Sequence, residues 1–181
     1  MTNPNIEIRD AETCDAASVL DYLTELQSEK LDTISRMQIP SLKSEQDWIG
    51  GAIDAEHDAI LLAWKNEAVI GMLDVQSGKR PHNRHAGMFG MSVARNWRQR
   101  GVGTRLVRAV LERCGSWQDF CRLELNVVPW NTGAISLYEK LGFEHEGRKR
   151  KGVNFRGTPE DLLVMSYTWD RDFGNESDTK P

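Results

Sequence analysis

The chain has 181 residues, 39% of them hydrophobic, and a formal net charge of -4 at pH 7. This composition is enough for one domain with a sizeable core, and the acidic balance argues against general nucleic-acid binding, which needs a basic face. The cysteines, Cys14, Cys114 and Cys121, form no CxxC pair, so neither a disulfide framework nor a metal site is expected. No apolar run is long enough for a membrane span, and a soluble, cytoplasmic protein without a membrane partner is predicted.

The first part of the chain is predicted to form a strand and two helices. Ile6–Arg9 alternates in hydropathy, as strands do. Apolar residues at helical spacing predict a helix within 10–30, and a loop with no clear period follows over 35–42. Ser44, three residues before Asp47, is typical of a helix start and predicts a short helix over 44–57.

The rest of the chain alternates between strands and helices. The predicted elements are a hairpin over 59–76, a strand over 86–94, a helix that follows Arg95–Arg100, a strand over 121–129, a helix over 131–143 and a strand pair over 144–157 and 159–169. This order predicts a single α/β domain over residues 1–170, with a mixed sheet and helices on both faces. Residues 171–181 are polar, lack apolar spacing and are predicted to be a flexible tail.

The stretch RNWRQRGVGTRLVRAVLERC, Arg95 to Cys114, gathers glycines and arginines at the start of an amphipathic helix. The first amides of a helix lack internal partners and carry the positive end of its dipole. Gly101 and Gly103 let a bulky anion approach those amides, and the arginines add charge. Glycines used for tight packing beside solvated arginines explain these residues equally well. The stripe expected on the sheet is Val102, Leu106, Val107, Val110, Leu111 and Cys114.

Two common phosphate-binding motifs are excluded here. The position three residues after Gly103 is Leu106, so the dinucleotide fingerprint G-x-G-x-x-G fails. No Lys-Ser/Thr pair follows the glycines, so a P-loop fails as well. The pattern therefore favours a cradle of another type, for a pyrophosphate.

Arg98-Gln99-Arg100-Gly101-Val102-Gly103 resembles the acetyl-CoA motif Arg/Gln-x-x-Gly-x-Gly/Ala of the GNAT family of N-acetyltransferases. The stretch NVVPWNTGAISLYEKLGFEHEGR is similar to the second signature of that family, with Tyr138 seven residues after Asn131 and Gly-Phe behind it. The resemblance covers Ile6 to Trp169 and is closest to bacterial amino-acid (YhhY-like) and ribosomal-protein (RimI-like) members. It implies a mixed, largely antiparallel sheet flanked by helices and splayed between the two strands around acetyl-CoA.

The resemblance also implies which residues bind the cofactor. Met91 and Val93 would hold the pantetheine arm through backbone groups, and a backbone N–H in the splay would polarise the thioester carbonyl. Asn131 would contact the cofactor, although a plain helix N-cap is an equally good interpretation. The implied cofactor-binding set is Met91, Ser92, Val93, Arg98, Gln99, Arg100, Gly101, Val102, Gly103, Thr104, Asn131 and Tyr138.

Acetyl transfer needs a neutral amine and a proton for the leaving thiolate. Tyr138 matches the tyrosine of the family and is the predicted general acid; its spacing alone would equally suit a core position. The glutamates that many relatives use as base are missing, since the strand before the motif reads AGMFG and the position five before Asn131 is Asn126. Glu124, on the same side of the same strand, is the predicted base, with an ion pair to an arginine as the alternative.

The predicted substrate contacts are Arg36, Met37 and Ile39 in the loop between the first two helices, together with Asn126; an ordinary surface loop is the alternative. No cysteine lies beside a histidine partner, so direct attack without a covalent acyl-enzyme is expected. The predicted acyltransferase acetylates a primary amine of a small molecule, a free amino acid or a related metabolite. A protein N-terminus is the alternative acceptor, and a catalytically silent CoA-binding module is the alternative to an enzyme. The family resemblance also implies a homodimer.

Overall fold

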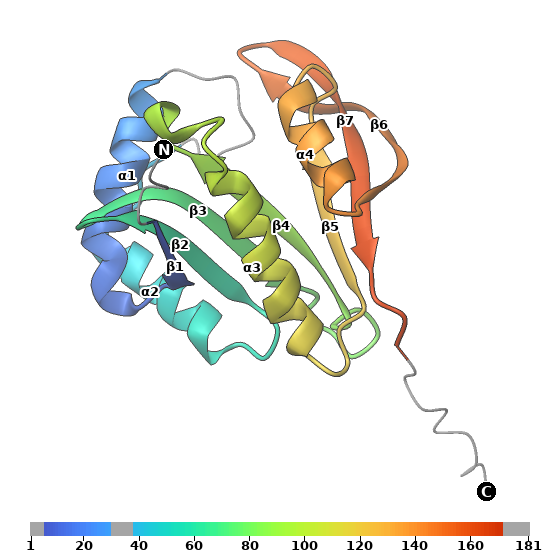
Figure 1. The fold of residues 1–181 in the computed structure, drawn as a ribbon, viewed down its shortest axis with the longest axis horizontal. Helices are drawn as coiled ribbons and strands as arrows, with labels where there is room; N and C mark the ends of the chain where they lie inside the picture. Colours follow the sequence, from blue (N-terminus) through green and yellow to red (C-terminus); the bar gives the residue numbers. More distant parts are fainter. Residues whose placement is uncertain (1–5, 30–37, 172–181) are drawn as a thin grey trace, which may run out of the picture.

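The computed structural model describes residues 6–29 and 38–171 (Figure 1). Within these ranges one sheet has the strand order β1-β2-β3-β4-β5-β7-β6, and every neighbouring pair is antiparallel except β4 and β5. The predicted mixed, largely antiparallel sheet is therefore confirmed. The strands are β1 (Glu7–Asp10), β2 (Ala59–Lys65), β3 (Ala68–Ser77), β4 (Ala86–Val93), β5 (Arg122–Val127), β6 (Glu144–Phe155) and β7 (Thr158–Thr168).

Helices cover both faces of this sheet, as predicted. They are α1 (Ala16–Ser28), α2 (Leu42–Asp54), α3 (Val102–Ser116) and α4 (Thr132–Lys140), with the short 3-10 helices η1 (Thr13–Asp15) and η2 (Arg95–Trp97). In the part of the chain that the structure describes, no helix is long and apolar enough to cross a bilayer.

The helix ends follow from capping residues. Asn131 caps α4 by accepting a hydrogen bond from Ala134 N at 3.3 Å. Gly142, with a φ of 89°, follows the end of α4 as expected for a C-terminal glycine. The predicted start of α2 at Ser44 is wrong, because Ser41 is the cap and its Oγ accepts from Ser44 N at 3.2 Å. Ser44 has an acidic residue three positions later and Ser41 does not, so the sequence pattern favoured the wrong serine.

Two apolar clusters sandwich the sheet. The larger lies under α3 and α4, and the predicted stripe of α3 is buried there apart from Leu111, which is partly buried. The smaller lies between the sheet and α1 and α2. Strand β2 contributes to both, with Leu61 in the first and Leu62 in the second, which explains its continuous apolar run. Figure 1 looks onto the face covered by α3 and α4.

Strands β4 and β5 diverge along their length. They pair only where Ala86–Met88 faces Arg122–Glu124, although β4 continues to Val93 and β5 to Val127. In Figure 1 the two strands meet near the bottom of the sheet and separate toward the top. This confirms the predicted splay, which divides the sheet into one half made of β1 to β4 and another made of β5, β7 and β6.

Candidate active site

The open part of β4 directs backbone groups into the splay. The N–H of Ala94, directly after the strand, donates to Ile70 O on β3 at 3.0 Å. Because the direction of the backbone groups alternates along a strand, Phe89, Met91 and Val93 direct theirs away from β3, toward the side that β5 has left. An extended ligand can bind such groups as an additional strand.

Helix α3 begins beside the open end of β4 without a side-chain cap from any described residue. Its N-cap is Gly101, whose φ of 81° lies in the left-handed region that favours glycine. The amides of Val102, Gly103 and Thr104 have no acceptor inside the helix, so they fit an anion. The side chain of Val102 is buried in the core, which leaves only its backbone for a ligand. A Cβ on Gly103 would lie 3.3 Å from Leu137 Cδ1, so this glycine allows α3 to lie close to α4.

The arginines around the motif already contact other parts of the protein. Arg98 donates from Nε to Val93 O at 2.9 Å and from Nη2 to Glu29 Oε2 at 2.6 Å. Arg100 lies over the Trp97 ring, 5.5 Å from its centroid, and is otherwise exposed together with Gln99. Arg98 therefore anchors the end of β4 to the end of α1, and a contact of its side chain with the cofactor stays a prediction.

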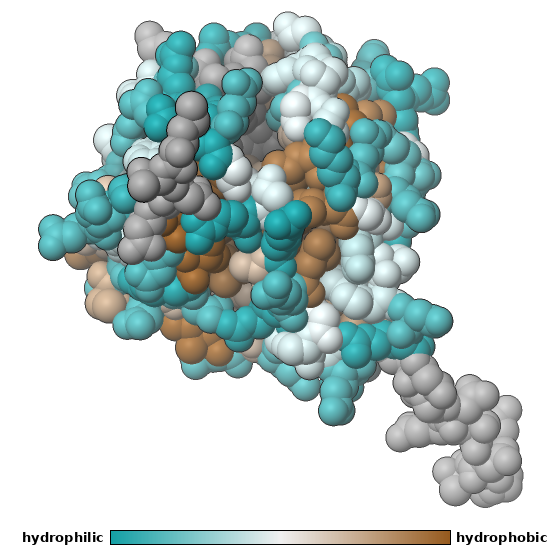
Figure 2. Space-filling model, viewed as in Figure 1, coloured by the Kyte–Doolittle hydropathy of each residue, from teal (hydrophilic) through white to brown (hydrophobic). Residues whose placement is uncertain are grey.

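A groove of about 250 Å³ separates α3 from α4. Figure 2 shows apolar surface gathered along the line between these helices. Thr104 was predicted from the motif; Arg108 and Lys140, the cations of the groove, were not. Arg108 lies one turn after Thr104, so helical spacing could have indicated it, whereas the position of Lys140 depends on how the helices pack. The lining residues are Thr104, Arg108, Gly133, Ser136, Leu137, Lys140 and Leu141.

Tyr138 of α4 packs between the groove and the splayed strand. Its ring meets Phe89 of β4 edge to face, with centroids 5.7 Å apart, and also contacts Phe143 at 5.8 Å. The residue is only 7% exposed, and burial raises the pKa of Tyr138 to about 12. Its hydroxyl is therefore protonated at neutral pH. Tyr138 is a core residue that can also donate a proton.

Glu124 and Asn126 lie on the opposite face of the sheet from Tyr138. Their neighbour Leu125 is buried under α3 and α4, and side chains alternate along β5. Glu124 accepts a hydrogen bond from Arg122 at 2.8 Å and lies 3.8 Å from Lys149 Nζ. This is the ion pair that the sequence left open as the alternative to a base.

Asn126 spans the splay on this face. Its Oδ1 accepts from Lys149 of β6 at 3.0 Å, and its Nδ2 lies 3.3 Å from Met88 Sδ of β4. Ile39, another predicted substrate contact, is exposed before α2. Arg36 and Met37 lie outside the described residues.

Ser92 faces α1 and not the groove. Its Oγ is hydrogen-bonded to the hydroxyl of Tyr22 at 2.8 Å, and its backbone pairs with Met72 of β3. Burial raises the pKa of Tyr22, which keeps its hydroxyl neutral. The structure therefore does not bring the Ser92 side chain together with the other predicted cofactor contacts.

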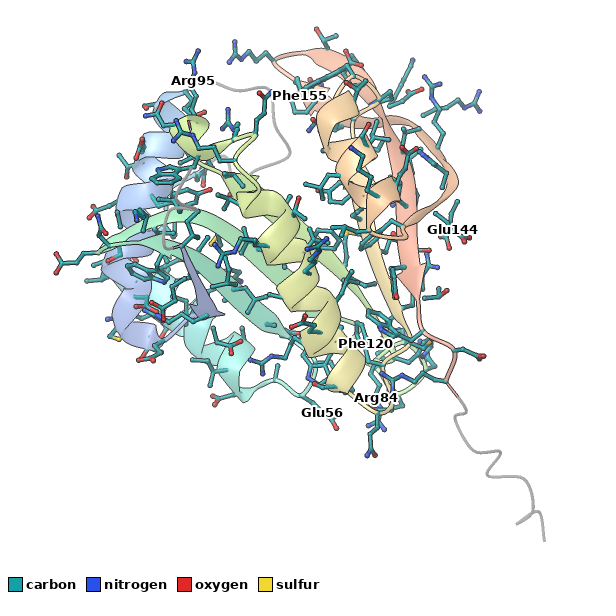
Figure 3. All side chains as sticks on the ribbon, in the orientation of Figure 1. Glu56, Arg84, Arg95, Phe120, Glu144 and Phe155 are labelled. Atoms are coloured by element: carbon teal, nitrogen blue, oxygen red, sulfur yellow. The ribbon has the colours of Figure 1, made fainter. Side chains whose placement is uncertain are left out.

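A second cluster of polar groups lies at the closed end of the splay. The possible metal-ligand atoms of Glu56, His57 and Asp119 lie within 4.8 Å of one another. Arg84 supplies a positive charge there, since Nη2 lies 3.1 Å from Asp119 and Nη1 4.0 Å from Glu56. Figure 3 labels Glu56 and Arg84 at this lower end, and Arg95 and Phe155 at the open end.

Comparisons with known proteins agree with this geometry. A model of the Acetyltransferase (GNAT) family matches residues 20–143. The L-amino acid N-acetyltransferase AaaT of Escherichia coli strain K12 is 32% identical over 161 residues, which are 89% of this chain and 96% of the relative.

Solved structures show the same fold. An acetyltransferase of the GNAT family from Streptococcus pneumoniae superposes with a TM-score of 0.86 at 24% identity, covering 91% of this chain and 100% of the other. A GNAT superfamily phosphinothricin acetyltransferase from Sinorhizobium meliloti, in complex with acetyl-CoA, gives 0.78 at 20% identity, covering 97% and 92%. The chain therefore belongs to the GNAT family and is an acetyl-CoA-dependent N-acetyltransferase.

Proposed function

We propose that this enzyme acetylates the α-amine of a free amino acid or a related small metabolite, by direct attack of the amine in a ternary complex. The observation that carries the acceptor class is the 32% identity to an L-amino acid N-acetyltransferase, over 96% of the length of that enzyme. The described site supports this proposal because the two faces of the sheet differ. The groove between α3 and α4 lies on one face and suits acetyl-CoA, and the polar side chains of β5 lie on the other face and suit the acceptor.

The residues around the splay fit acetyl-CoA. The uncapped amides at positions 102–104 would bind the pyrophosphate, and the backbone groups of Met91 and Val93 would bind the pantetheine arm. Arg108 and Lys140 would hold the negatively charged nucleotide end in the groove. Acetyl-CoA supplies the thioester from which the acetyl group is taken.

Tyr138 is the proposed general acid, because its hydroxyl carries a proton at neutral pH and its ring packs directly against β4. Glu124 remains the base proposed from the sequence, acting through water, although Arg122 and Lys149 both lie within ion-pair distance of its carboxylate. Asn131 caps α4 and would meet the cofactor at the edge of the groove.

Direct attack is supported by where the cysteines lie. Cys114 is buried in α3, and burial raises its pKa to about 12, so it is a thiol at neutral pH. Cys121 precedes β5, at the closed end of the splay, and Cys14 is exposed in η1. None of the three is placed to carry the acetyl group.

A panel of acceptors tests the proposal. Purified protein is incubated with acetyl-CoA and free L-amino acids, spermidine or a short peptide with a free N-terminus, while a thiol reagent reports CoA release. We expect the highest kcat/KM with an amino acid, a product one acetyl group heavier by mass spectrometry, and no turnover with the same amino acid already N-acetylated. A preference for the peptide would favour a protein N-terminus as acceptor. Acetyl-CoA binding without CoA release from any amine would indicate a silent binding module.

The expected homodimer is tested on the same preparation. Strand β6 forms one of the two edges of the described sheet, and its unpaired side is a candidate surface for pairing. Sedimentation that gives twice the chain mass would support a dimer, and a monomer at assay concentration would exclude one.

A further inference from the structure

Strand β6 contributes a cation to the polar face of β5. Lys149 of β6 pairs with Leu162 of β7, and its side chain extends across β7, where Nζ donates to Asn126 Oδ1 at 3.0 Å. The same Nζ lies 3.8 Å from Glu124 Oε1. Because β7 separates β6 from β5 in the sheet, this lysine reaches over a whole strand. Its ammonium group therefore lies beside the residues of β5 that border the splay, on the face turned away from the viewer in Figure 1.

An irregular part of β6 holds Lys149 in this position. The pairing of β6 with β7 shifts its register between Lys149 and Val153. Such bulges redirect side chains and are frequent beside active sites. Asp161 of β7 fixes the backbone on both sides of Lys149, since it accepts from Arg148 Nε at 2.6 Å and from the N–H of Lys151 at 2.7 Å. The reach of Lys149 toward β5 therefore has a built support.

The contact with Lys149 also orients the amide of Asn126. A lysine ammonium group can only donate, so it binds the amide oxygen and leaves the NH2 group on the side of β4. There Nδ2 lies 3.3 Å from Met88 Sδ, and a thioether is a weak acceptor. Asn126 and Lys149 thus provide N–H donors on one polar face, and such a pair fits a carboxylate.

The other cation of this face is already occupied. Arg122 donates to both carboxylate oxygens of Glu146 and to Glu124 Oε2, so two carboxylates of the protein engage its guanidinium. Lys149 has three N–H donors, and Asn126 takes one of them. The side chain of Lys149 is 48% exposed, so an incoming anion can reach it. Lys149 is therefore better suited than Arg122 to bind a ligand.

Glu124 and Lys149 together match the charges of a free amino acid. The nitrogen and the carboxylate carbon of an α-amino acid are about 2.5 Å apart, and the opposite charges of the two side chains are separated by 3.8 Å. The acceptor ammonium group would meet Glu124, which pairs with Met88 of β4, and the carboxylate would meet Lys149. This orientation places the amine on the side of β4. A polyamine has no carboxylate to offer, and a peptide carries its own far from its N-terminus.

We propose that Lys149 binds the α-carboxylate of the acceptor and gives the enzyme its preference for free amino acids over other primary amines. Asn126 holds the ammonium group in place and supplies a further N–H donor. The inference rests on the proposed amino-acid acceptor and adds the group that recognises it. Because the carboxylate takes no part in bond making, its contact is the same in the ground state and in the transition state. Lys149 should therefore lower the KM for the acceptor and leave kcat nearly unaltered.

The test compares an L-amino acid with its carboxamide as acceptors for the wild type and for Lys149→Met. Methionine keeps an unbranched apolar side chain and removes the charge. For each enzyme we measure the ratio of kcat/KM for the acid to kcat/KM for the amide. The two amines differ in pKa, but this difference cancels when the ratios of the two enzymes are divided. We expect the wild-type ratio to exceed that of Lys149→Met about tenfold, as for a charge-assisted hydrogen bond at a partly exposed site, and the change to lie in the KM for the acid.

Two further variants separate a direct contact from a general effect of charge. Arg150→Met is the matched control, because it removes a positive charge from the next residue of β6, which is also exposed. It should keep the wild-type ratio. Lys149→Arg preserves the charge and should keep most of the ratio. The Kd for acetyl-CoA and the Tm of Lys149→Met should stay near their wild-type values, since an exposed ion pair adds little stability.

The failure of this proposal differs from the failure of the amino-acid acceptor. If the wild type acetylates amino acids but Lys149→Met has the same acid-to-amide ratio, or Arg150→Met loses as much of it, Lys149 is not the carboxylate site. A loss that lies in kcat with an unchanged KM would also overturn the assignment. If the wild type acetylates spermidine or a peptide and no amino acid, the proposed acceptor is wrong and the carboxylate site is wrong with it.

Discussion

The guanidinium of Arg98 donates to the carboxylate of Glu29 at 2.6 Å and joins the cofactor motif to the end of α1. The same carboxylate accepts from the backbone N–H of Arg95 at 3.0 Å. Glu29 follows α1, where the helix dipole disfavours a negative charge, so the arginine compensates it. Through Arg98 Nε and Val93 O this pair also fixes the last residue of β4. Three hydrogen bonds therefore fix the turn that leads into α3.

Removing this carboxylate should loosen the turn. We expect Glu29→Ala to lower the free energy of unfolding by about 1 kcal/mol, since Arg98 is partly exposed and water can hydrate it. Urea unfolding measures the change. Glu25→Ala, at an exposed position one turn earlier in α1, should leave the midpoint nearly unaltered. Equal midpoints for both variants would contradict a stabilising role for the pair.

Tyr138→Phe tests the proposed acid. The variant removes the hydroxyl and keeps the ring that packs on Phe89, so we expect kcat to fall about 10²-fold with an unchanged Kd for acetyl-CoA. Tyr167→Phe, in the aromatic cluster of β7, is the matched control and should retain its rate. Parallel loss of rate and cofactor affinity in Tyr138→Phe would assign the residue to packing.

The sequence predicted the order of elements well because the hydropathy periods are clear. The run AILLAWK, for example, indicates a strand buried on both faces, and β2 is one. The family resemblance added the splay. Contacts between distant segments could not be predicted from the sequence. Arg98 was predicted as a cofactor contact, but its carboxylate partner Glu29 lies 69 positions earlier in the chain.

The same limit applies to the predicted base. Lys149 reaches Glu124 from β6, whose pairing with β7 is interrupted by register shifts that no period in the sequence reveals. The elements were therefore predictable, and the partners that determine each side chain's role were not.

The cations of the groove should contribute modestly to cofactor affinity. Arg108 and Lys140 are exposed, so each is expected to be worth about 0.5 kcal/mol, and the double change to alanine should raise the Kd for acetyl-CoA about fivefold. The difference should shrink in high salt because exposed charges are screened. Lys43→Ala on α2 is the control. If the double change to alanine leaves the Kd for acetyl-CoA unaltered, the nucleotide end must bind outside the groove.

Two glycines should respond to alanine with opposite signs. Gly101 has a φ of 81°, so Gly101→Ala is expected to cost about 1 kcal/mol and to lower the Tm by about 2–4 °C. Gly51 lies inside α2 with nothing in the described structure within 4 Å of an added Cβ, so Gly51→Ala should stabilise by about 0.5–1 kcal/mol. Calorimetry of both variants measures these changes in Tm. An unchanged Tm in Gly101→Ala would contradict the need for glycine at this left-handed position.

Acid should weaken the outer strands through Glu146. Arg122 and then Ser166 hydrogen-bond its carboxylate and lower the pKa of Glu146 from 4.5 to about 2. A lowered pKa stabilises the fold above pH 4.5, and this contribution is lost as the pH falls through about 2. The effect is small because the side chain is 37% exposed. Between these pH values the Tm of Glu146→Gln should fall less steeply than that of the wild type or of Glu144→Gln; parallel curves would contradict this.

The partial pairing of β4 and β5 also has a mechanical consequence. Three residue pairs join the two halves of the sheet, and beyond them the backbone groups of Met91 that point away from β3 face no neighbouring strand in the described structure. A molecule that hydrogen-bonds to these groups takes the place of a missing strand and stiffens the joint between the halves. Binding of acetyl-CoA would then complete the sheet as well as deliver the acetyl group. The amide protons in the open part of β4 would exchange faster in the free enzyme than in the enzyme with bound acetyl-CoA.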